Sequence, residues 1–195
     1  HYKWWVYMAV GTGMFATVVD QSGVIIAVPK IGEWFALDIP TAQWINLVFI
    51  LSTSALIMPL GRLSDILGGK RVYMGSIFIF VVGAIASGAA VAFPVLLVTR
   101  AFQGIGVAGV SATSMAIMTT VFPERERGKA MGLFILLVGA GLSAGPVVGG
   151  ALVSEFGWRS VFFASVPFGL IALLSTQSIL DVGQISSATK PERFR

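Results

Sequence analysis

The sequence predicts an all-α membrane protein in which six transmembrane helices form two inverted three-helix repeats. Three observations support this prediction: the composition is apolar, six apolar segments are long enough to cross a bilayer, and the junctions between them repeat. Of the 195 residues, 56% are hydrophobic and 11% are charged. Soluble domains carry about 25% charged residues, so we expect this chain to lie in lipid.

The six predicted spans follow one another with short, charged loops between them. A helix needs about 20 mostly apolar residues to cross the hydrocarbon core, and continuous apolar segments without alternation favour helices over the strands of a barrel. The spans are expected at residues 5–28, 44–60, 72–93, 95–121, 130–153 and 160–180. Together they predict a transmembrane bundle over residues 1–180, and residues 181–195 are expected to be a cytoplasmic tail or the start of a linker to a missing second half.

The positions of lysine and arginine predict the orientation in the cell (inner) membrane. With the N-terminus inside, the outer loops hold only Lys30 and Arg159, and Arg100 lies within a span. The cytoplasmic segments hold the other ten basic residues: Lys3, Arg62, Lys70, Arg71, Arg125, Arg127, Lys129, Lys190, Arg193 and Arg195. Basic residues concentrate on the cytoplasmic side, so both termini are expected there. This topology explains the net positive charge, and no nucleic-acid partner is expected.

An internal repeat supports the inverted arrangement. A shift of 89 residues places the junction between the second and third spans on the junction between the fifth and sixth. The matched pairs are Gly61 with Gly150, Leu63 with Leu152, Gly68 with Gly157, Val72 with Val161 and Tyr73 with Phe162. The two junctions lie on opposite sides of the membrane, and a repeat with inverted topology is typical of transporters.

The loop over residues 61–71 reads GRLSDILGGKR. Its glycines permit a tight turn and close helix approach, and its aspartate can cap a helix and pair with a cation. The loop resembles the major facilitator signature G-x-L-x-D-R-x-G-R-K/R between helices two and three, with Ile66 and Gly69 in place of two arginines. The resemblance implies a gating loop formed by Gly61, Asp65, Gly68, Lys70 and Arg71. An ordinary solvated loop is the alternative.

The fourth span contains Arg100. An arginine within a span costs at least about 2.5 kcal/mol on insertion scales, so we expect it to face a polar interior and a partner. Gln103, Gly104 and Ser111 fall on the same helical face and are expected to line a cavity. The segment LVTRAFQGIG is similar to the family's fourth-helix motif, whose arginine is linked to proton coupling. The alternative is that Arg100 snorkels to the outer headgroups.

The fifth span contains the segment GLSAGPVVGG. Gly141, Gly145 and Gly149 recur every four residues and form a smooth stripe for close helix contact, while Pro146 removes a backbone donor and bends the helix. With Gly150, the segment matches every fixed position of G-x-x-x-G-P-x-x-G-G, and so resembles the motif associated with antiporters in this superfamily. Small-residue packing without a role in transport direction is the alternative.

The first span contains DQSGVIIAVP, which begins at Asp20. It resembles the D-x-T-V-V-N-V-A-L-P stretch of the fourteen-span drug:proton antiporters, with Ser22 for threonine and Ile25 for asparagine. Trp158 and Arg159, with the residues that follow them, are similar to the start of the sixth helix in that family. Because these motifs cover nearly the whole chain, it resembles the N-terminal half of such an antiporter.

Asp20 is the one carboxylate within a predicted span, and Arg100 lies at similar depth. We expect both to face one water-filled cavity, where Asp20 takes up and releases protons as access alternates. The predicted function is proton-coupled efflux of drugs or other small lipophilic molecules. The expected partners are a small-molecule substrate, protons, the lipid bilayer and the missing C-terminal half of the same chain. A structural ion pair, a nutrient symporter or facilitator, and a non-transporting bundle are the alternatives.

Enzyme chemistry is not expected. The chain has no cysteine and a single histidine, His1, which leaves little for metal or nucleophilic chemistry. The segment from Gly104 to Gly109 fits GxGxxG but lies in an apolar helix instead of following a strand. Ser143 lies in a GxSxG segment without a histidine to activate it. We therefore expect no cofactor and no metal.

Overall fold

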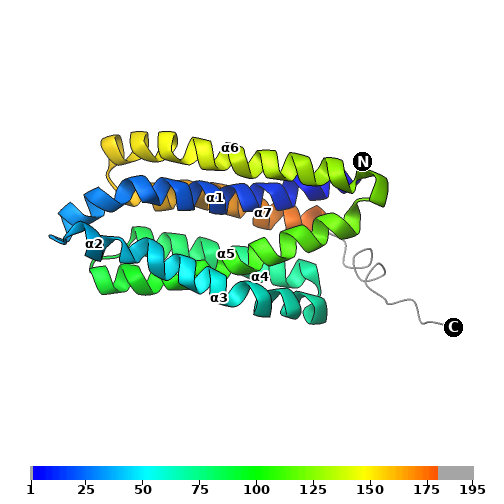
Figure 1. The fold of residues 1–195 in the computed structure, drawn as a ribbon, viewed down its shortest axis with the longest axis horizontal. Coiled ribbons are helices and arrows are strands. Elements are labelled where there is room, and N and C mark those ends of the chain that lie inside the picture. Colours follow the sequence, from blue (N-terminus) through cyan, green and yellow to red (C-terminus); the bar gives the residue numbers. More distant parts are fainter. Residues whose placement is uncertain (1, 180–195) are drawn as a thin grey trace.

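The computed structural model describes residues 2–179 and folds them into a bundle of helices (Figure 1). The helices are α1 (Tyr2–Trp34), α2 (Ile39–Ala42), α3 (Trp44–Leu67), α4 (Gly69–Gly88), α5 (Phe93–Val121), α6 (Glu124–Phe156) and α7 (Arg159–Ile179). With the short α2 joined to α3, six helices are long and apolar enough to cross a membrane. The prediction of an all-α fold with six spans is therefore confirmed.

Most helices extend beyond the apolar segments that predict them. Helix α1 has 33 residues and rises about 50 Å at 1.5 Å per residue, whereas the hydrocarbon core is about 30 Å thick. Helix α6 begins at Glu124, directly after Pro123, and its first turn carries Glu124 and Glu126. Carboxylates there interact favourably with the positive end of the helix dipole, so this helix starts before its apolar segment does.

Helix α4, the third long enough to cross a membrane, is shorter than the predicted span 72–93. Helix α4 ends at Gly88, and α5 already begins at Phe93 with Pro94 in its first turn. Proline is favoured at the start of a helix because its missing N–H is not needed there. The last described helical residue is Ile179, so the predicted span end at 180 and the predicted tail 181–195 lie outside the described residues.

The bundle has two layers of three helices (Figure 1). Helices α1, α6 and α7 form one layer, and α3, α4 and α5 form the other. Within the layers, α1 packs on both α6 and α7, and α5 packs on both α3 and α4. Contacts between α4 and α7 and between α1 and α5 join the layers. The two helices that carry intramembrane charges, α1 and α5, therefore contact each other across the layer boundary.

The contacts repeat between the two halves of the chain. Helix α3 packs on α5 as α6 packs on α1, and α4 packs on α5 as α7 packs on α1. Gly68 and Gly157, which the 89-residue shift relates, form the α3–α4 and α6–α7 junctions with φ of +90° and +79°. The helices α1, α3 and α4 of the first repeat thus correspond to α5, α6 and α7 of the second, as the inverted repeat predicts.

The interior consists of two apolar clusters. One contains large side chains from α1, α3, α4, α5, α6 and the α5–α6 junction, among them Phe49, Tyr73, Phe80 and Phe122. The other contains Ile31, Ile45, Leu96, Trp158 and Phe162. Helices α3 and α6 bury only 11% and 17% of their most apolar windows, so their outer faces present apolar surface to the surroundings.

Candidate functional site

The structure brings the two predicted intramembrane charges together. Arg100 Nη1 on α5 donates to Asp20 Oδ2 on α1 at 2.8 Å, and neither side chain has exposed surface. Helices α1 and α5 are the first helices of the two repeats, and each packs on the other two helices of its layer. The Asp20–Arg100 pair thus joins the two layers at a buried position.

Polar neighbours complete this pair into a small cluster. Arg100 Nη1 also donates to Gln103 Oε1 at 2.7 Å, one helical turn along α5. The single hydroxyl hydrogen of Ser165 on α7 is shared between the carbonyl of Phe162 at 2.9 Å and Asp20 Oδ1 at 3.3 Å. Each carboxylate oxygen of Asp20 therefore accepts a hydrogen bond, which offsets part of the cost of burying its charge.

Two aromatic rings enclose the guanidinium. The Arg100 Cζ atom lies 4.0 Å from the ring centroid of Phe49 on α3 and 5.6 Å from that of Phe162 on α7. Both phenylalanines are themselves buried. These rings occupy the space beside the charges, and neither Asp20 nor Arg100 has exposed surface in this conformation. The water-filled cavity expected around the pair stays a prediction.

The cluster contains more hydrogen-bond donors than acceptors. Within the described chain, Arg100 Nε, Arg100 Nη2 and Gln103 Nε2 are buried and have no acceptor. An unsatisfied buried donor costs about 1–3 kcal/mol, and more when the group is charged. The arrangement is therefore predisposed to take up a further acceptor, such as a water oxygen or a polar atom of a bound molecule.

The other predicted cavity-lining residues lie further along α5. Gly104 is buried against α3, and a Cβ atom there would lie 2.8 Å from the carbonyl oxygen of Phe49. The hydroxyl hydrogen of Thr53 on α3 is shared between the Phe49 carbonyl at 2.9 Å and the Gly104 carbonyl at 3.1 Å. Gly104 thus allows α3 and α5 to approach closely, and Ser111 is half-buried two turns further on.

The predicted antiporter motif packs on α1 beside Asp20. A Cβ on Gly141 would lie 3.0 Å from Val18 Cγ1, one on Gly149 would lie 2.8 Å from Gly23 Cα, and one on Gly145 would overlap Ser22. The Ser22 hydroxyl also reaches the Gly141 carbonyl at 3.3 Å. The four-residue stripe is thus a close helix contact two residues along α1 from the buried carboxylate.

Two further residues of this motif lie off the contact. Pro146 and Gly150 are half-buried. Pro146 lies within α6, which continues through it to Phe156. These two residues therefore belong to the same helix as the glycine stripe without taking part in its closest approach to α1.

The predicted gating loop is mostly helical. Helix α3 continues through Leu67, which places Gly61 and the exposed Asp65 in its last turns and leaves Gly68 as the one residue between α3 and α4. Lys70, at the start of α4, donates to the Gln177 carbonyl near the end of α7 at 3.2 Å, and Arg71 is exposed. None of these residues lies close to Asp20 along the helix axes.

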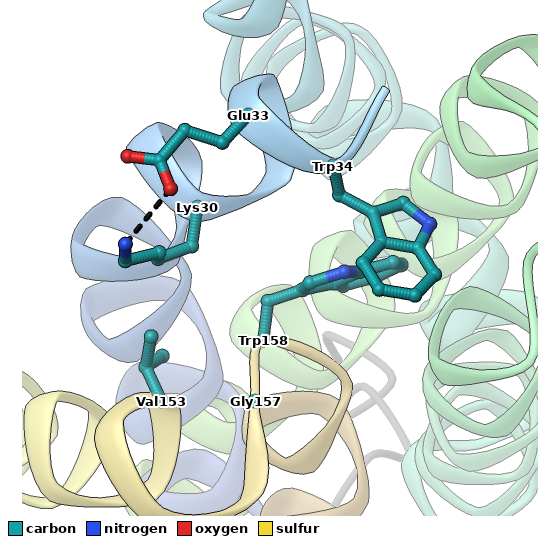
Figure 2. A pocket seen from close by; sticks show the side chains of 6 residues that line it. All are labelled: Lys30, Glu33, Trp34, Val153, Gly157 and Trp158. Carbon is teal, nitrogen blue, oxygen red and sulfur yellow. Dashed lines mark hydrogen bonds and ion pairs between the residues drawn. The ribbon is translucent and has the colours of Figure 1, made fainter. Parts of the chain in front are cut away.

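A separate hollow of about 330 Å³ lies at the opposite end of the bundle, where α1 ends and α6 meets α7 (Figure 2). Its lining residues are Lys30, Glu33, Trp34, Val153, Gly157 and Trp158. The ammonium of Lys30 donates to Glu33 at 2.8 Å, as the dashed line in Figure 2 marks. Lys30 is ten residues from Asp20 along α1, or about 15 Å of helix rise, so this hollow is distinct from the ion pair.

Sequence reasoning missed Phe49, Phe162 and Ser165. Phe49 is one of fourteen phenylalanines, and a single sequence does not distinguish the one that contacts a charge from those that face lipid. Ser165 lies one turn after Phe162, and a small polar residue in an apolar span was the only signal. Among the described residues, no group of three His, Cys, Asp or Glu side chains could hold a metal ion.

Comparison with known proteins identifies relatives over most of the chain. The chain is 36% identical over 170 residues to the multidrug resistance protein Stp of Mycobacterium tuberculosis, covering 87% of this chain and 32% of that protein. It is 34% identical to the riboflavin transporter RibZ of Clostridioides difficile, with 88% and 38% covered. It is 30% identical to the tetracenomycin C resistance and export protein of Streptomyces glaucescens, with 96% and 35% covered. The chain thus spans about a third of the length of these relatives.

Solved structures show the same fold. A bacterial homologue of the human lysosomal transporter Spinster, in an inward-facing and occupied conformation, matches with a TM-score of 0.70 at 24% identity, covering 91% of this chain and 43% of that one. The family model described as Major Facilitator Superfamily matches residues 10–190. The chain is therefore a multi-pass membrane protein that belongs to the major facilitator superfamily of transporters.

Proposed function

We propose that this chain is the N-terminal half of an exporter that moves drugs or other small lipophilic molecules out of the cell in exchange for protons. The observation that supports this proposal is the buried Asp20–Arg100 pair at 2.8 Å. In the described chain, the other charged side chains lie at or near the ends of the helices. A buried charge pair is costly to maintain for stability alone, and an intramembrane ionisable residue is by default a candidate for function.

Protonation of Asp20 would remove the negative charge that balances the guanidinium of Arg100. A neutral carboxyl group no longer balances the guanidinium, which already has two nitrogens without acceptors in the described structure. The protonated state therefore favours a rearrangement that exposes Arg100 to water or to a polar atom of the substrate. A proton taken up at Asp20 is in this way coupled to a change of conformation, and its release restores the closed pair.

The relatives support export as the direction of transport. Stp is named a multidrug resistance protein, and the Streptomyces glaucescens relative is named for tetracenomycin C resistance and export. The close contact of Gly145 and Gly149 with α1 joins the antiporter-like segment to the helix that carries Asp20. The exposed apolar faces of α3 and α6 would contact lipid and the second half of the complete transporter, with the N-terminus of α1 in the cytoplasm.

The test uses the complete transporter in inverted membrane vesicles with an imposed proton gradient and a panel of lipophilic dyes. We expect gradient-driven dye accumulation with the wild-type protein, and loss of it with Asp20→Asn. Asp20→Glu, which keeps a titratable group, should retain part of the transport. Full gradient-driven transport by Asp20→Asn would contradict the role of Asp20.

A second candidate is a nutrient transporter, because RibZ, a riboflavin transporter, is 34% identical to this chain. The two functions differ in how transport responds to the gradient. Riboflavin entry that persists after an ionophore collapses the proton gradient would favour this second candidate over a proton-driven exporter.

A further inference from the structure

The contact between Phe49 and Arg100 is unusual for the helix that provides it. Helix α3 has three buried residues, Ile45, Phe49 and Ser64, and its most apolar window is only 11% buried. Phe49 is 1% exposed and places its ring centroid 4.0 Å from Arg100 Cζ. The deepest aromatic side chain of a largely peripheral helix therefore lies against the buried charge.

Neighbouring residues hold α3 in the position that this contact requires. Gly104, one turn after Arg100, leaves room for the Phe49 carbonyl, which would lie 2.8 Å from a Cβ at that position. The hydroxyl of Thr53, one turn after Phe49, shares its single hydrogen between the Phe49 carbonyl at 2.9 Å and the Gly104 carbonyl at 3.1 Å. One turn of α3 is thus fixed on one turn of α5 beside the ion pair.

We propose that Phe49 is the aromatic lid of the Asp20–Arg100 site, a positioning residue whose ring keeps water from the pair and whose withdrawal with α3 admits it. This inference rests on the proposed function and adds to it the residue that controls access to the proton-binding carboxylate. A ring face stabilises a desolvated guanidinium by about 2 kcal/mol, which favours the closed state. The donors on Arg100 and Gln103 that lack acceptors in the described structure favour the hydrated state.

No other charge in the described chain competes for this site. The remaining charged residues of the described chain lie near helix ends: Lys3, Lys30 and Glu33 on α1, Asp38 before α2, Arg62 and Asp65 on α3, Lys70 and Arg71 on α4, Glu155 and five residues near the start of α6, and Arg159 on α7. Access of water to the pair therefore depends on the groups that surround it directly. Phe162 also lies near Arg100 but at 5.6 Å, so its ring contributes less to the closed state.

The absence of cysteine from this chain makes water access measurable. A Ser165→Cys substitution places a thiol beside Asp20, since the Ser165 hydroxyl lies 3.3 Å from Asp20 Oδ1. The complete transporter carries this substitution with other cysteines replaced, and the rate of modification by the neutral, water-soluble reagent 2-hydroxyethyl methanethiosulfonate is measured. Phe49→Leu is combined with it, Phe49→Tyr serves as the ring-preserving variant, and Phe80→Leu is the matched control.

We expect Phe49→Leu to raise the modification rate about thirtyfold, as loss of a desolvated cation–π contact of about 2 kcal/mol would do to the opening equilibrium. Phe49→Tyr should stay within about twofold of the parent, because the ring face is retained. Phe80 is also buried, but among the described residues the rings over the Arg100 guanidinium are those of Phe49 and Phe162, so Phe80→Leu should leave the rate near that of the parent. Equal rates for Phe49→Leu and Phe80→Leu would overturn the lid.

The same variants without Ser165→Cys separate the lid from the proposed function. In vesicles, Phe49→Leu should let protons cross without substrate and lower the amount of substrate moved per proton, whereas Phe80→Leu should not. If the wild-type protein shows no proton-driven transport while the modification rates follow the expectation, the proposed function fails and the lid stands. If transport is proton-driven but Phe49→Leu matches Phe80→Leu in both measurements, the lid fails and the proposed function stands.

Discussion

Gly68 and Gly157 occupy equivalent junctions of the two three-helix repeats and share a left-handed backbone conformation, with φ of +90° and +79°. They are 89 residues apart, the shift at which the sequence repeats. Each joins the second helix of its repeat to the third. This correspondence shows that the inverted repeat extends to the backbone geometry of single residues.

Replacement of either junction glycine by alanine should destabilise the protein through the backbone alone. A Cβ at Gly68 or Gly157 would meet nothing within 4 Å, so no steric clash contributes. A non-glycine residue held in such a conformation costs about 1–3 kcal/mol. Thermal unfolding of the purified protein should show a lower midpoint for Gly68→Ala and for Gly157→Ala. An unchanged midpoint for both would contradict the strained junctions.

The glycine stripe on α6 should tolerate no side chain where it meets α1. Gly149→Ala would place a Cβ 2.8 Å from Gly23 Cα, and backbone does not move aside as a flexible side chain would. We expect a stability loss of about 1–3 kcal/mol together with a strong loss of transport. The measurement is thermal unfolding and dye transport of the variant.

The matched control for this prediction lies on the same helix. A Cβ on Gly139 would meet nothing within 4 Å, and alanine favours a helix over glycine by about 1 kcal/mol. Gly139→Ala should therefore be neutral or stabilising. If Gly139→Ala and Gly149→Ala behaved alike, close packing on α1 would not be what the stripe provides.

Replacement of Arg159 by lysine should lower the stability of the bundle end that carries the hollow in Figure 2. Its guanidinium Cζ lies 4.9 Å from the Trp34 ring and 4.4 Å from the Trp158 ring, and Nη2 donates to the Ala90 carbonyl at 2.9 Å. A planar guanidinium can stack and donate at once, whereas an ammonium cannot. We expect Arg159→Lys to lower stability by about 1–2 kcal/mol. A thermal midpoint equal to wild type would contradict this.

The Asp20–Arg100 pair should show strong coupling in a double-mutant cycle. Removal of one partner leaves a buried charge without its counter-ion and costs about 3–5 kcal/mol. Asp20→Asn and Arg100→Gln should each destabilise the protein, and the double variant should recover much of the loss. Additive losses measured by chemical or thermal unfolding would show that the two charges do not interact as the 2.8 Å contact indicates.

Much of the fold could be predicted from the sequence because a membrane-spanning helix needs a long apolar segment, which is easily recognised. Six long apolar segments give the spans, and the repeat of Gly68 at Gly157 gives the inverted topology. Helix ends were less accurate, since polar turns such as the one at Glu124 extend a helix beyond its apolar segment. Helix α4 ends at Gly88 although the apolar segment continues to Phe93, which already belongs to α5.

The site was only partly predictable. A charge in a span has so few tolerable surroundings that the proximity of Asp20 and Arg100 could be inferred from two residues. The sequence did not predict that Phe49 and Phe162 lie over the guanidinium, and the expected open cavity stays a prediction. Which aromatic side chains do so depends on the rotation of α3 and α7 about their axes, and hydrophobic patterns on all sides of a helix do not determine that rotation.

Proton release on substrate binding would show directly whether Asp20 couples protons to substrate. The purified complete transporter, in a weakly buffered detergent solution with a pH-sensitive dye, is mixed with a transported dye or drug. We expect the wild-type protein to release protons on mixing and Asp20→Asn to bind the same molecule without release. Equal proton release from the wild-type protein and from Asp20→Asn would contradict it.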